Sequence, residues 1–231
     1  MKVPKIWFFD MEGTILKKNH ELDNGKVAPS AWTVLAKDLG EECYLEEELT
    51  KDKWRARHYK GYLDWMKDTV LIHKKYGMTS QHLQNIVDRA EFHDGVEELF
   101  AWLHSHGVIT ALITGGFKSL ADRVQKHLKI DHALSGCEYF FDSDGFIEFF
   151  NLLPSDHEGK LSFMKQVLFE HGLTPKEAAF VGDGENDRHL AECAGFSIAF
   201  NAQKELKKRS TVSIDQPIGH ENLADIISLF K

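Results

Sequence analysis

The chain has 231 residues, of which 42% are hydrophobic and 28% are charged, as is usual for a globular protein with a substantial core. Its net charge of −8 and its pI near 5.9 argue against nucleic acids and anionic membranes as main partners. No apolar stretch approaches the roughly 20 residues of a membrane span, and we recognise no signal-peptide core, so we expect a cytoplasmic protein. The three cysteines are far apart and predict buried thiols without a disulfide framework.

The first predicted element is a short buried strand over the apolar run 6–9, which Asp10 follows directly. Glu12 lies two positions further on, in a turn that contains Gly13. Because ligands of open α/β sheets bind beyond the carboxyl ends of the strands, this corner would bring both acids to a ligand. Two such carboxylates suit phosphoryl transfer, in which one attacks and the other moves protons.

Residues 16–91 have the spacing of several helices and contain no convincing strand. Ser30 is a candidate cap for the first of these helices. We therefore expect a helical module inserted after the first strand. Three of the five tryptophans fall in this module, and they either pack its small core or line a substrate pocket: Trp32, Trp54 and Trp65.

From Asp94 onward the sequence alternates between strand and helix patterns. Asp94 and Glu97 have the spacing of a capping box. An Asp-Gly turn within 139–149 predicts a β-hairpin. The other runs predict strands over 108–113, 178–181, 197–200 and 211–214, and helices over 118–128, 160–170 and 223–230. This alternation indicates a parallel sheet that helices cover on both faces.

Polar or loop-forming residues follow three of the predicted strands: Asp10 with Glu12, Thr114 with Gly115, and Asp183 with Asp187. A parallel sheet brings these three strand ends to one edge. Lys160 opens a helix between the second and third of them. In a protein of negative net charge, an anionic substrate needs a local cation, and a bound metal ion together with a lysine would supply it.

These motifs resemble those of the haloacid dehalogenase superfamily, in its phosphoserine-phosphatase-like branch. The first family motif, Asp-x-Asp-x-Thr, matches residues 10–14 with Glu12 in place of the second Asp. The second, a Ser or Thr at a strand end, matches Thr114, and the third, a lysine ahead of a helix, matches Lys160. The fourth, Gly-Asp-Gly-x-Asn-Asp, matches residues 182–187 in full. The resemblance spans nearly the whole chain.

The resemblance implies an α/β fold in two parts. Residues 1–15 and 92–231 would form a core with a Rossmann-like parallel sheet, and residues 16–91 would form a helical cap domain inserted after the first strand. Hinges near 15–19 and 91–94 would let the cap open and close over the site.

The resemblance also implies a hydrolase, namely a Mg²⁺-dependent phosphatase of small-molecule phosphomonoesters that works through an aspartyl-phosphate intermediate. Asp10 would be the nucleophile, and Glu12 would protonate the leaving alcohol and then activate water. The implied metal ligands are Asp10, the backbone carbonyl of Glu12, Asp183 and, in support, Asp187. The implied phosphate contacts are Thr114, the Gly115 amide, Lys160 and Asn186.

Some residues have competing interpretations. Asp187 could simply cap the helix that starts there, and Lys165 competes with Lys160 from the middle of the same helix. His104 and His106 imitate a metal-binding pair, but their i, i+2 spacing points them to different faces of a helix.

Two departures from the family concern the substrate. Phosphoserine phosphatases bind the substrate amino group with a glutamate nine residues after the nucleophile, where this chain has Asn19, although Glu21 is near. They bind the substrate carboxylate with a cap arginine that aligns with Val70. Arg55 belongs to a basic tract that could offer replacement cations, although a solvated helix face is the favoured interpretation of that tract. We therefore expect a substrate other than phosphoserine that is larger or less zwitterionic, such as a sugar phosphate, a cofactor precursor or a phospholipid head group.

Three alternatives stay open at this point: phosphoserine phosphatase activity, phosphoryl transfer to an alcohol acceptor, and a non-catalytic phosphate-binding role. Loss of a catalytic residue would favour the last alternative. The set that catalysis requires is unbroken, however, since the chain keeps Asp10, Thr114, Lys160 and Asp183. The sequence does not predict the oligomeric state.

Overall fold

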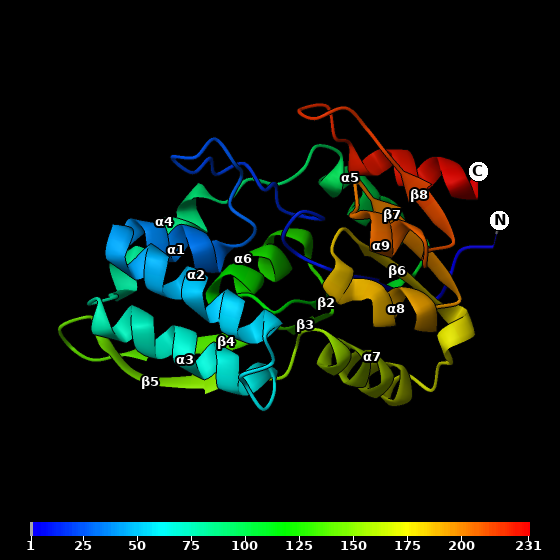
Figure 1. Ribbon diagram of the computed structural model, residues 1–231. Helices are drawn as coiled ribbons and strands as arrows, with labels where there is room; N and C mark the ends of the chain where they lie inside the picture. Colours follow the sequence, from blue (N-terminus) through cyan, green and yellow to red (C-terminus); the bar gives the residue numbers. More distant parts are fainter. Residues whose placement is uncertain (1) are drawn as a thin grey trace.

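The computed structural model describes residues 2–231 and contains a six-stranded parallel sheet (Figure 1). The strands run in the order β3-β2-β1-β6-β7-β8, so the strand order reverses at the central β1. Their bounds are β1 Ile6–Phe9, β2 Ile109–Ile113, β3 His132–Leu134, β6 Ala178–Gly182, β7 Phe196–Phe200 and β8 Val212–Ile214. The predicted α/β fold with a parallel sheet is confirmed. The reversal places the residue after β1 in the crevice where such folds bind ligands.

Helices cover both faces of the sheet, and their bounds are α5 Val96–Ser105, α6 Lys118–Leu128, α7 Glu158–Glu170, η1 Pro175–Glu177, η2 Glu185–Asp187, α8 Arg188–Cys193, α9 Lys204–Lys207 and η3 Leu223–Phe230. Alternate side chains of β1 are buried against opposite layers. Phe8 packs among residues of α7 and α8. Phe9 packs on the other face, with its ring centroid 4.8 Å from that of Phe100 in α5. Within residues 2–231, no helix is both long and apolar enough to cross a bilayer.

Four helices between β1 and α5 form a second lobe together with a β-hairpin (Figure 1). Their bounds are α1 Ala31–Asp38, α2 Glu41–Arg55, α3 Tyr62–Lys75, α4 Ser80–Arg89, β4 Cys137–Phe141 and β5 Ile147–Leu152. The amide of Ser80, at the start of α4, donates to the carbonyl of Gly145 in the hairpin turn at 2.8 Å. One hydrophobic cluster continues from the sheet into these helices through Met11 and Ile15. The boundaries of a cap at 16–91 stay a prediction, and the structure adds the hairpin to the lobe.

Of two predicted helix caps, one is confirmed in position only and the other is wrong. Ser30 occupies the N-cap position of α1 without a side-chain cap bond, and the carboxylate of Glu12 accepts from the Ala31 amide at 2.5 Å instead. Asp94 and Glu97 form no capping box, because α5 begins after Gly95, which has a left-handed backbone with φ of 73°.

A buried polar network ties the second lobe together. The Glu47 side chain in α2 lies 3.1 Å from His73 Nε2 in α3 and accepts from the Thr33 hydroxyl of α1 at 3.3 Å. His73 Nδ1 in turn lies 3.3 Å from the Tyr139 hydroxyl of β4. Burial alone would raise the pKa of Glu47, but the hydrogen bond from His73 and the charge of Lys51 outweigh it and lower that pKa.

We expect Phe8→Ala to lower the free energy of unfolding by about 3–5 kcal/mol, because it removes a fully buried ring from β1. Urea unfolding followed by circular dichroism measures the change. Phe169→Ala is the matched control, since that ring is 86% exposed, and we expect a change within about 0.5 kcal/mol. Equal losses in the two variants would contradict the described packing.

We expect Glu47→Gln to lower the free energy of unfolding at about pH 7 by about 1–3 kcal/mol, because a charged hydrogen-bond acceptor is lost. A carboxylate whose pKa is lower in the folded state stabilises the protein above its unfolded pKa and loses this effect as the pH falls through the folded value. The difference from the unsubstituted protein should therefore shrink below about pH 4.5. Glu42→Gln, at an exposed position of the same helix, is the control. A difference that does not vary with pH would refute the role of the Glu47 charge.

Candidate active site

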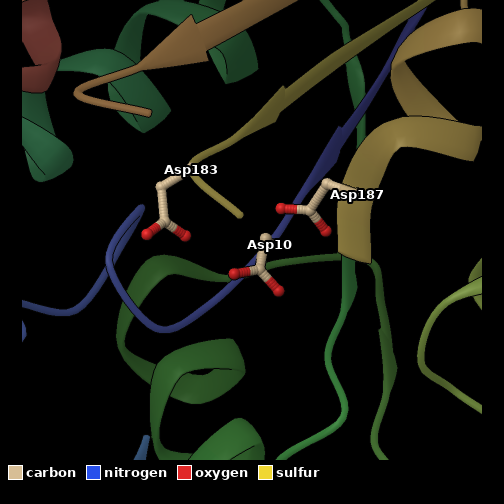
Figure 2. A group of neighbouring side chains, drawn as sticks. All are labelled: Asp10, Asp183 and Asp187. Carbon is tan, nitrogen blue, oxygen red and sulfur yellow. The ribbon is translucent and has the colours of Figure 1, made fainter. Parts of the chain in front are cut away.

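Three carboxylates converge at the carboxyl edge of the sheet (Figure 2). Asp10 follows β1, Asp183 follows the neighbouring β6, and Asp187 ends the short helix η2. One oxygen of each lies within 4.8 Å of the others. Parallel pairing of β1 with β6 accounts for this convergence, because it brings the two strand ends side by side.

The Lys160 ammonium group lies between two of these carboxylates. It donates to Asp10 Oδ1 at 2.6 Å and to Asp187 Oδ1 at 2.7 Å, and the side chain is fully buried. Burial alone would lower the pKa of Lys160, but the charges of Asp10 and Asp187 outweigh it and keep that pKa above its ordinary value. The competing Lys165 is exposed. The structure therefore places a permanent cation beside Asp10.

Asp187 has partners for both oxygens. Its Oδ1 accepts from Lys160, and its Oδ2 accepts from the Gly184 amide at 3.2 Å. Burial raises the pKa of Asp187 to about 7, against the opposing charge of Lys160. These contacts fit a residue that positions Lys160 and the turn after β6.

Glu12 combines burial with a fixed position. Its carboxylate accepts a hydrogen bond from the Ala31 amide at the start of α1. Burial raises the pKa of Glu12 to about 7, although the Ala31 amide and the charge of Lys18 lower it. A carboxyl group with such a pKa exchanges protons near neutral pH, as a general acid and base must.

Gly13 makes the turn after β1 possible. Its φ of 84° is in the left-handed region, and a Cβ there would lie 2.4 Å from Asp183 Oδ2. A side chain at this position would therefore push apart the turn and the Asp183 carboxylate.

The loop after β2 faces the same carboxylates. Thr114 Oγ1 accepts from the Gly116 amide at 3.0 Å, so its own hydrogen is available to a ligand. The carbonyl of Gly115 accepts from Trp32 Nε1 at 3.2 Å and from the Tyr62 hydroxyl at 3.4 Å. The second lobe thus holds this loop in place. Across the edge, Asn186 donates to Asp156 at 2.6 Å.

A cavity of about 200 Å³ lies between the sheet edge and the second lobe. Pockets for drug-sized ligands measure roughly 300–1,000 Å³, so this cavity suits a small ligand. The sheet side contributes Asp10, Glu12, Thr114, Gly115, Asp156, Asp183 and Asn186, and the helical side contributes Trp32, Glu47, Lys51, Tyr62 and Trp65. Two of the three tryptophans therefore line the cavity. Trp54 stacks on Trp65, with ring centroids 4.9 Å apart.

The four residues predicted to set substrate specificity lie elsewhere. Val70 is fully buried in the hydrophobic core. Arg55 is exposed and pairs with Asp52 at 2.8 Å. Asn19 and Glu21 are exposed, and neither lines the cavity. The structure does not bring these four to the cavity.

The charged groups on the helical side of the cavity were not predicted from the sequence. Lys51 Nζ donates to the Thr33 hydroxyl at 2.7 Å and lies 3.2 Å from Glu47 Oε1. The i, i+4 spacing of Glu47 and Lys51 in α2 was a detectable signal of this pair. Lys18 and Asp156 also line the cavity without having been predicted.

A family model described as haloacid dehalogenase-like hydrolase matches residues 4–195. The chain is 28% identical to a phosphoserine phosphatase of Archaeoglobus fulgidus, over 98% of this chain and 60% of that protein. It is 29% identical to a phosphoserine phosphatase of Streptococcus thermophilus, over 78% of this chain and 82% of the relative. It is 23% identical to a phosphoserine phosphatase of Methanocaldococcus jannaschii, over 100% of this chain and 99% of the relative.

Solved structures show the same fold. A phospho-aspartyl intermediate analogue of phosphoserine phosphatase superposes with a TM-score of 0.74 at 18% identity, covering 100% of both chains. A hydrolase of the haloacid dehalogenase family from Salmonella enterica serovar Typhi superposes with a TM-score of 0.78 at 18% identity, over 99% of this chain and 73% of that one. The family model covers most of the chain, and the sheet with its edge of carboxylates agrees with it. The chain therefore belongs to the haloacid dehalogenase-like hydrolases and resembles the phosphoserine phosphatases among them.

Proposed function

We propose that this hydrolase cleaves small phosphomonoesters through an aspartyl-phosphate at Asp10, and that phosphoserine is its substrate. The observation that carries the proposal is the position of the Asp10 carboxylate, at the end of the central strand, 2.6 Å from the Lys160 ammonium group and beside Glu12 in a small cavity. The relatives described above are named phosphoserine phosphatases, which supports the choice of substrate.

The donor set at the sheet edge fits Mg²⁺. This ion prefers oxygen ligands in octahedral geometry and keeps some of its waters. Asp10 and Asp183 each offer a carboxylate at the edge, and we expect them to hold the ion together with the backbone carbonyl of Glu12. We assign Asp187 the supporting role of holding Lys160, because both of its oxygens already have partners. The bound ion would neutralise charge on the transferred phosphoryl group.

The reaction proceeds in two displacements. A carboxylate oxygen of Asp10 attacks phosphorus, the phosphorus–oxygen bond to the alcohol breaks, and Glu12 gives its proton to the leaving oxygen. Glu12, now ionised, takes a proton from a water molecule, which attacks phosphorus and releases inorganic phosphate from Asp10. The raised pKa of Glu12, about 7, suits both proton transfers.

The oxygens of the phosphoryl group need donors that are already in place. Lys160 supplies a buried ammonium group, and Thr114 supplies a hydroxyl whose hydrogen is available. We also assign contacts to the Gly115 amide and to Asn186, which line the same cavity. Such preorganised donors stabilise charge that develops in the transition state.

The helical side of the cavity offers opposite charges for the rest of the substrate. Lys51 can exchange Glu47 for the carboxylate of phosphoserine. Glu47 can then pair with the substrate amino group while it keeps Thr33 and His73 as partners. The small volume and this charge pair favour an amino-acid head group over the larger substrates that the sequence suggested. We therefore assign substrate recognition to Glu47 and Lys51, in place of the four residues that lie away from the cavity.

We expect phosphoserine to have the highest kcat/KM among phosphoserine, phosphoethanolamine, glycerol phosphate and glucose phosphate, measured as phosphate release with Mg²⁺. Asp10→Asn should lower kcat by at least about a thousandfold, because the nucleophile is lost. The exposed Asp144→Asn is the control and should keep full activity.

Another ester at the head of the panel would refute phosphoserine as the substrate but not the mechanism. Formation of a new phosphate ester on an added alcohol, without release of inorganic phosphate, would show transfer to an acceptor. Full activity of Asp10→Asn would refute the aspartyl-phosphate, and binding of the esters without turnover would indicate a non-catalytic role.

We expect Lys51→Met to raise KM for phosphoserine by about tenfold or more, because a carboxylate loses its ionic partner. Phosphoethanolamine has no carboxylate, so its KM should hardly change. Lys53→Met, on the exposed side of the same helix, is the control. Equal effects on the two substrates would contradict the assignment of Lys51 to the carboxylate.

A further inference from the structure

Lys18 has an ion pair that the proposed reaction does not use. Its Nζ lies 2.6 Å from Asp183 Oδ2, and the side chain is 28% exposed. It lines the cavity together with Asp10 and Glu12. A lysine side chain keeps its proton at neutral pH, so this contact is an ion pair between an ammonium group and a carboxylate.

The turn at Gly13 makes room for this ammonium group. A Cβ at Gly13 would lie 2.6 Å from Lys18 Nζ and 2.4 Å from Asp183 Oδ2. The absent side chain thus lets the ammonium and the carboxylate meet directly above the turn. The contact also joins two parts of the chain, because Lys18 lies in the segment between β1 and α1 and Asp183 follows β6.

An ammonium group on Asp183 conflicts with a divalent cation at the same carboxylate. Both are positive, and they repel each other strongly in a partly buried site. Asp183 is one of the two carboxylates that we expect to hold Mg²⁺. The ion must therefore compete with Lys18, whose charge already neutralises that carboxylate.

We propose that Lys18 is a built-in counter-ion of Asp183 that a divalent cation must displace. This inference rests on the metal site of the proposed function. In the absence of metal, Lys18 offsets part of the repulsion among Asp10, Asp183 and Asp187. When the cation binds, the ammonium group is released into a cavity that receives an anionic substrate, so metal and phosphate binding support each other.

We expect Lys18→Met to bind Mg²⁺ about tenfold more tightly than the unsubstituted protein, a change of about 1.4 kcal/mol. Isothermal titration of Mg²⁺ into the EDTA-treated protein at about pH 8, where carboxylates are ionised, measures the affinity without substrate. Lys17→Met is the matched control, because that neighbouring lysine pairs with Asp94 at 3.1 Å and does not line the cavity. Its Mg²⁺ affinity should not change.

A second readout covers the event that Lys18→Met is poorly stable. Lys18→Gln should show a larger rise in Tm on adding Mg²⁺ than the unsubstituted protein, because the ion no longer displaces an internal partner. Equal or weaker Mg²⁺ binding by the variants would overturn the proposal for Lys18 and leave the metal site of the proposed function standing. Absence of Mg²⁺ binding to every protein, including the unsubstituted one, would overturn both.

Discussion

The site depends on one buried ammonium group among carboxylates. Lys160 is fully enclosed and donates to Asp10 and Asp187, and without it two buried negative charges would face each other beside a third, Asp183. A buried ion pair contributes little net stability, since desolvation costs about as much as the attraction returns. Removing one partner is far more costly, because it leaves an unpaired charge. The fold must therefore position β1, α7 and η2 together, and this requirement links the sheet to the chemistry.

Most of the fold and the sheet side of the site were predictable because they depend on short local patterns. Runs of four to six residues predicted five strands of the sheet, and the residues that follow them meet because parallel strands end at one edge. The edge strand β3 was not predicted, because its three residues begin with a histidine and none of them is fully buried. The cap at Asp94 failed because a left-handed glycine started the helix one residue later, which the capping motif alone does not predict.

The helical side was not predictable in the same way. Family alignment pointed to Asn19 and Val70, but Val70 faces the core, and the cavity is lined by Glu47 and Lys51. Charged residues on a helix are usually exposed, so sequence alone does not show that Glu47 is 1% exposed. That burial depends on His73 and Tyr139, which are distant in sequence. The helical side of a cavity formed by two lobes therefore requires the structure.

The most direct test of the account is to identify the residue that carries the phosphoryl group during turnover. Borohydride reduces an acyl phosphate to an alcohol, so protein quenched with borohydride during turnover of phosphoserine with Mg²⁺ should contain homoserine at the position of the nucleophile. Peptide mass spectrometry should find this change at Asp10 and in no control without substrate. Turnover with an unmodified Asp10, or modification of another carboxylate, would contradict the account.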